Sequence, residues 1–133
     1  MNVRRDEAGL VGKMIVIWLL FLGLIAVAAI DAASIAFTTY KLSDVGAAAA
    51  SEGARVYRGS HDVRETCARV AEVVTAQDPT ARVARGGCSV ERPTGLVTVK
   101  VRKLASTLVA HRIQWTEDFA KVTVSETAGP PSL

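Results

Sequence analysis

Residues 14–30 read MIVIWLLFLGLIAVAAI and contain no charged side chain. Lys13 stands before this run and Asp31 follows it. A helix rises about 1.5 Å per residue, so a bilayer core of about 30 Å needs about 20 apolar residues. The run is slightly shorter, but residues 32–37, AASIAF, continue its apolar character. We therefore expect a helix that enters a membrane, with Asp31 near one interface, where its carboxylate can reach water or headgroups.

Two uses of this segment remain open. A secretory signal peptide would also have basic residues first, an apolar middle and small residues at the cut, here Ala26 to Ala28. The apolar stretch is longer than a usual signal core, and it runs past Ala28 without a break. These features favour a retained anchor over a cleaved signal.

The basic residues around the run predict its orientation. Arg4, Arg5 and Lys13 precede it, whereas Lys41 is the only basic residue soon after it. Basic flanks stay on the cytoplasmic side. We expect a single-pass protein of the plasma membrane, with a cytoplasmic N-terminus and an extracytoplasmic C-terminal domain.

The chain has two cysteines, Cys67 and Cys88, and both follow the apolar run. An even number of cysteines in an exported segment predicts a disulfide, which would stabilise so small a domain by roughly 3 kcal/mol. Two buried free thiols in a cytoplasmic domain are the alternative.

Helical periodicity continues beyond the membrane. Residues 38–57 contain no proline, and apolar residues recur every three or four positions, at Ile35, Leu42, Val45, Ala49 and Val56. Gly46 and Gly53 weaken a helix but allow another backbone to approach. We expect one long helix that ends near Gly59.

A second helix is predicted from Ser60, as the N-cap, to the Asp78-Pro79 pair. Asp62 would lie in its first turn. Its apolar face is formed by Val63, Cys67, Val70 and Val74.

Strands are predicted by alternation at residues 97–102 and 120–125, and more weakly at 82–90, where Gly86-Gly87 interrupts the pattern. Residues 104–115 are ambiguous and include a short helix from Ser106 as one option.

The expected fold is α+β: a long, partly transmembrane N-terminal helix, a second helix and a small antiparallel sheet. A Cys67–Cys88 disulfide would join the second helix to the sheet edge. The segments expected are a cytoplasmic start at 1–13, a transmembrane helix at 14–37, its continuation at 38–59, an α+β domain at 60–128 and a disordered tail at 129–133.

Chemistry-bearing motifs are scarce. Ser60-His61-Asp62 contains the residue types of a hydrolase triad, but neighbours at a helix start do not place the imidazole between its partners. His61, Cys67, Cys88 and His111 match no common zinc spacing. The net charge is only +3 and aromatic residues are 5% of the chain, which argues against nucleic-acid binding. We expect no catalytic site, metal, cofactor or small-molecule substrate.

Small residues recur along the apolar helix. Ala29, Ala32, Ala33 and Ala36 follow the spacing that permits close packing of helices in membranes. These alanines predict packing against copies of the chain or against related helices, with membrane lipid around them. General alanine usage with packing onto the chain's own sheet is the alternative.

Taken together, residues 9–57 resemble the TadE-like pilus-assembly proteins. The resemblance rests on Gly9, the apolar helix, Asp31, the aromatic residues Phe37 and Tyr40, and the alanine-rich continuation at 47–54. It implies a pilin-like fold and a pseudopilin-like assembly role in a tight-adherence (Flp-type) pilus system, with other pilus-system helices as partners.

The resemblance also implies a processing site. In that family a prepilin peptidase can cut after a glycine, with a glutamate five residues into the mature chain. A cut between Gly9 and Leu10 would place Met14 at that position, which departs from the family pattern. The rival hypothesis for the whole chain is a secreted or anchored disulfide-stapled binding module unrelated to pili.

Overall fold

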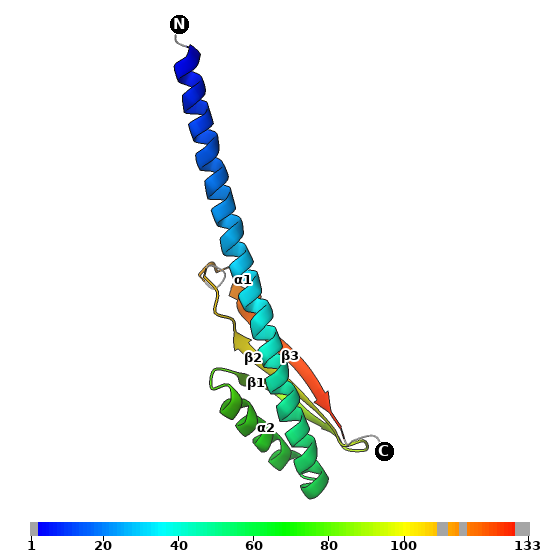
Figure 1. Ribbon diagram of the computed structural model, residues 1–133. Helices are drawn as coiled ribbons and strands as arrows, with labels where there is room; N and C mark the ends of the chain where they lie inside the picture. Colours follow the sequence, from blue (N-terminus) through cyan, green and yellow to red (C-terminus); the bar gives the residue numbers. More distant parts are fainter. Residues whose placement is uncertain (1–2, 109–111, 115–116, 130–133) are drawn as a thin grey trace.

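The computed structural model describes residues 3–108, 112–114 and 117–129 (Figure 1). Its elements are α1 (Val3–Ser60), α2 (Val63–Gln77), β1 (Arg82–Glu91), β2 (Leu96–Leu104), α3 (Glu117–Ala120) and β3 (Lys121–Ala128). The three strands form one antiparallel sheet in the order β1-β2-β3. Helix α2 and the C-terminal half of α1 lie beside this sheet, whereas the N-terminal half of α1 projects away from it. This arrangement confirms the α+β fold.

Helix α1 runs for 58 residues without interruption. Its C-terminal half forms part of the core through Leu42, Val45 and Ala49, which are almost fully buried. Ile35 packs at the edge of the same core. Four of the five predicted stripe positions therefore face the core. The fifth, Val56, is half-buried and outside this core, whereas Ala54 and Tyr57 are buried at that level. The helix ends at Ser60, one residue beyond the expected Gly59.

The start of the second helix differs from the prediction. Ser60 is not its N-cap, because Ser60 is still the last residue of α1 and its hydroxyl donates to the Val56 carbonyl. His61 follows with a φ of 54°, which breaks the helix. Asp62 is the N-cap, and its carboxylate accepts from the backbone N–H of Arg64.

The centre of the inner face of the sheet is made by β2. Val97, Val99 and Val101 are completely buried and belong to one core cluster with residues of α1 and α2. The alternating residues of β2 point to the other, more exposed face, as the pleat requires. The predicted strand at 97–102 is thus confirmed as the central strand.

The weak strand candidate at 82–90 is a full strand with an irregularity. Its pairing with β2 shifts between Val83 and Cys88. Gly86 has a φ of +65°, and a Cβ on Gly87 would meet the Ala84 carbonyl oxygen at 2.7 Å. The two glycines therefore shape a bulge within β1 and do not end it.

The segment between β2 and β3 contains no helix at residues 105–108, so a helix starting at Ser106 is wrong. The short α3 lies later, at Glu117–Ala120, and β3 begins at Lys121. His111, Trp115 and residues 130–133 of the expected tail lie outside the described residues.

The disulfide prediction is confirmed. Cys67 of α2 and Cys88 of β1 are bonded, with their Cα atoms 5.8 Å apart. Because β1 is an edge strand, the bond joins α2 to the edge of the sheet, as expected.

Gly53 marks the closest approach of α1 to its neighbours. A Cβ at this position would lie 2.7 Å from Val70 Cγ2 of α2 and 3.1 Å from Val97 Cγ1 of β2. The close neighbours are side chains and not a second backbone. Val70 and Val97 are both fully buried, and valine is stiff at χ1, so neither can move easily.

We expect Gly53→Ala to lower the free energy of unfolding of the domain by about 1–2 kcal/mol. Overpacking costs about 1–3 kcal/mol, whereas the helix-propensity gain is at most about 1 kcal/mol. Gly59→Ala is the matched control, since a Cβ there meets nothing within 4 Å. Denaturant unfolding of the purified full chain in detergent measures both, and equal stability of the two variants would contradict the packing assignment.

Candidate functional site

The N-terminal half of α1 carries an uncovered apolar surface. Large apolar side chains from Leu10 to Ile30 are exposed, with Leu20 at 70% and Leu24 at 68%. This helix, near the N-terminus, is long and apolar enough to span a membrane. Exposure on this scale in water would be unfavourable, so the surface is suited to lipid or to other helices.

The four alanines predicted as packing positions lie at and just beyond the C-terminal end of this surface, near the middle of α1. Ala29, Ala32, Ala33 and Ala36 are all exposed. At about 100° per residue they fall on one side of the helix, within roughly 100° of each other. Contact with the domain involves other positions at this level: Asp31 is buried and Ile35 is half-buried.

The alternative explanation for the alanines, which is packing onto the chain's own sheet, applies only at positions further along the helix. Ala49 and Ala50 are fully buried in the chain's own core. These two alanines thus pack in the core with α2 and the sheet, whereas Ala47 is exposed. Ala29, Ala32, Ala33 and Ala36 are also exposed, and packing of these four against another chain stays a prediction.

Gly9 and Leu10, the predicted processing positions, both lie within α1. Both are exposed, and a Cβ on Gly9 would meet nothing within 4 Å. The structure therefore leaves the peptide between them uncovered by the domain.

Asp31 ends the apolar run, and its carboxylate is not directed to water or headgroups as expected. It is only 7% exposed, and its Oδ1 accepts a hydrogen bond of 2.6 Å from the backbone N–H of Leu108. One turn along, the Ser34 hydroxyl donates to the Ser106 carbonyl. Two polar side chains of α1 thus hold the loop that follows β2. Burial of a carboxylate is tolerated because such a partner is present.

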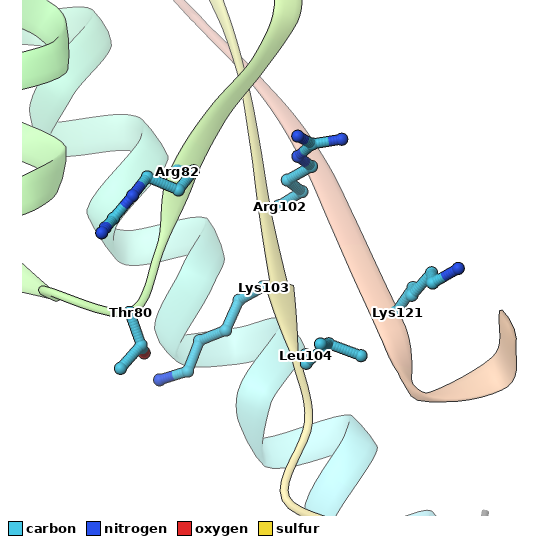
Figure 2. Close-up of a pocket in the computed structure, with 6 residues that line it drawn as sticks. All are labelled: Thr80, Arg82, Arg102, Lys103, Leu104 and Lys121. Atoms are coloured by element: carbon cyan, nitrogen blue, oxygen red, sulfur yellow. The ribbon is translucent and has the colours of Figure 1, made fainter. Parts of the chain in front are cut away.

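A basic hollow lies near the same end of the sheet (Figure 2). Its volume is about 310 Å³, and it is lined by Thr80, Arg82, Arg102, Lys103, Leu104 and Lys121. The basic side chains point in different directions and do not meet at one centre. This geometry makes a basic surface whose charges are spread apart.

Several of these basic groups already have partners. Lys103 Nζ lies 2.6 Å from Asp78 Oδ2, and a guanidinium nitrogen of Arg82 donates to the Ala81 carbonyl at 2.8 Å. Lys121 pairs with Asp118 at 3.1 Å on the exposed surface. Sequence reasoning missed this cluster, because its residues are far apart in the chain and no short motif joins them.

The residues weighed for catalysis or metal binding that the structure describes have structural roles, and His111 lies outside the described part of the chain. Asp62 caps α2, and His61 packs its ring 5.6 Å from that of Tyr57 at the turn between the helices. Cys67 and Cys88 are bonded to each other, so neither has a free thiol. Within the described residues, no group of three or more His, Cys, Asp or Glu side chains is arranged to hold a metal.

Comparisons with known protein families, with curated proteins and with solved structures found no match to this chain.

We expect Asp31→Ala to release the loop after β2. The bond from the Leu108 N–H to a carboxylate is worth about 1.5–3 kcal/mol, so hydrogen exchange at that amide should accelerate by roughly ten- to a hundredfold. Amides of the buried strand β2 should be unaffected. Asp44→Ala, at an exposed position of α1, is the control. Exchange at Leu108 that is the same in both variants would rule out the tether.

Asp78 gives the domain a predictable pH dependence. The Lys103 ammonium and the Thr80 hydroxyl hydrogen-bond to its carboxylate and lower its pKa from 3.8 to about 2. A lowered folded-state pKa means that the stabilisation is present above the unfolded pKa and lost as the pH falls towards 2. Asp78→Asn should therefore be less stable than the native chain at pH 5–7, with a difference that shrinks below pH 4.

Denaturant unfolding of both proteins from pH 7 to pH 2 measures this effect. Asp118→Asn is the control, because its ion pair with Lys121 is exposed and such pairs contribute little. A difference between native and Asp78→Asn chains that is constant down to pH 2 would contradict the assignment.

Proposed function

We propose that this chain is a single-pass membrane protein of pseudopilin type, which acts in the assembly of a tight-adherence (Flp-type) pilus by packing its helix against other helices. The N-terminus is cytoplasmic and the disulfide-bonded domain is extracytoplasmic. The partners are pilus-system helices or further copies of this chain.

One observation carries the proposal: the apolar half of α1 is uncovered, and its alanine stripe is exposed while neighbouring positions hold the domain. Small side chains allow two helix backbones to approach closely in a membrane, where packing and not water exclusion drives association. The stripe is therefore available to a partner without any rearrangement of the domain.

The disulfide supports the extracytoplasmic side. Disulfides such as Cys67–Cys88 persist in oxidising compartments and are rare in the cytoplasm. The basic residues before the apolar run favour a cytoplasmic N-terminus, and the two arguments agree. The pilus system itself is proposed from the resemblance over residues 9–57.

Ala29→Leu combined with Ala33→Leu should weaken co-purification of the chain with tagged copies or pilus-system subunits by about tenfold. Two bulky side chains on one face separate the backbones, and loss of about 1–2 kcal/mol of helix packing corresponds to that factor. The protein should remain in the membrane fraction, since leucine is more apolar than alanine. Pull-down from solubilised membranes measures the effect.

The matched control is Gly12→Leu combined with Gly23→Leu. At about 100° per residue these positions lie on another side of the helix, and a Cβ at either meets nothing within 4 Å. Equal loss in both double variants, or unchanged co-purification in the alanine variant, would contradict packing through the stripe. Recovery from the medium of a chain that begins near Ala29 would instead support the secreted binding module.

A further inference from the structure

Exposed apolar side chains outside α1 gather at one place. Among the described residues after Tyr40, the large apolar side chains that are exposed are Leu104, Leu108 and Ile113, at 57%, 56% and 37%. All three belong to the end of β2 and the segment that follows it. The opposite end of the sheet, at the β1–β2 turn, has no such residue. A cluster confined to one end indicates contact with an apolar surface there.

This end lies at a defined height along α1. The Leu108 N–H binds Asp31, and the Ser106 carbonyl accepts from Ser34. From Met14 to Asp31 the helix rises about 26 Å, and the hydrocarbon core is about 30 Å thick. If the core begins after Lys13, the loop therefore lies at its far boundary.

The loop's own backbone limits how deep it can go. Irregular backbone exposed to lipid is not tolerated within the hydrocarbon region, because its polar groups have no water. Side chains of leucine and isoleucine can nevertheless enter the zone where headgroups meet acyl chains. The described part of the loop fits the interface, because α1 binds the backbone at Ser106 and Leu108 and the side chains of Leu108 and Ile113 are exposed.

Basic residues at the same height agree with this position. Arg102, Lys121 and Arg112 are exposed near the loop, and Figure 2 shows Arg102 and Lys121 pointing away from the strands. Basic side chains that fan out suit a surface of anionic headgroups more than a single ion.

We propose that the described part of the segment after β2, residues 105–108 and 112–114, is a second membrane contact, in which Leu108 and Ile113 insert at the bilayer surface beside the exit point of α1. The occupant of this apolar patch is the lipid bilayer itself. The contact would fix how the domain stands on the membrane. This inference rests on the proposed membrane anchor.

The test uses the full chain in vesicles of phosphatidylcholine and phosphatidylglycerol with bromine near the headgroup end of the acyl chains. Trp18→Phe and Trp115→Phe remove the native indoles, and Leu108→Trp or Ile113→Trp adds a single reporter. Bromine quenches an indole only at short range. We expect about a twofold loss of fluorescence at either reporter, as for side chains buried about 5–10 Å into the interface.

Two controls make the result decisive. Arg92→Trp, in the same background, places the reporter in the exposed β1–β2 turn and should not be quenched. A chain that keeps only Trp18 reports on the anchor, and the same bromine should quench it, since Trp18 lies only about 7.5 Å of helix rise beyond Lys13. Quenching of Trp18 without quenching at Leu108→Trp and Ile113→Trp would overturn the loop contact and leave the anchor standing. Absence of quenching at Trp18 would overturn the anchor, and the loop contact with it.

Discussion

The uninterrupted hydrogen-bond ladder of α1 is the constraint on which the rest of the structure depends. A helix that ended at the membrane boundary would leave four carbonyl groups without partners in a region with little water. By continuing to Ser60, α1 places that end far beyond its apolar run. Its extension then supplies Leu42, Val45 and Ala49 as one wall of the core. The same helix thus carries the apolar surface and forms part of the core of the domain.

Local patterns were enough to predict most of this architecture. The alternation of Val97, Val99 and Val101 has a single structural meaning, because a period of two places all three on one face. The helical spacing of Val63, Cys67 and Val70 was sufficient for α2 in the same way. The disulfide was predicted from the presence of two cysteines in a segment expected to be exported.

Backbone conformations with positive φ were harder to predict. His61 adopts a φ of 54° with no glycine to announce it, so the helix start was assigned to Ser60 when Asp62 is the cap. Gly86 was recognised as a break, but a glycine can end a strand or make a bulge within it. Pairing with β2 across the irregularity decides between the two, and that pairing is a property of the folded sheet.

The junction between α1 and the loop could not be predicted, because its partners are 77 and 72 residues apart. A lone aspartate after an apolar run has an economical local explanation, which is exposure to water at the interface. Burial of Asp31 changes the physical role of the residue. In a site with little water, its bond to the Leu108 N–H is stronger than the same bond on an open surface.

The bond between Asp31 and the Leu108 N–H joins the end of the apolar run to the domain. The position of that run and the orientation of the domain are therefore coupled. Because α1 is a continuous helix, each residue between Asp31 and Leu42 contributes about 100° of rotation and about 1.5 Å of rise. The angle between the alanine stripe and the domain is therefore set by residue count alone. A partner helix that packs on Ala29 and Ala33 would meet a domain already turned away from it, so packing in the membrane would not compete with the fold outside.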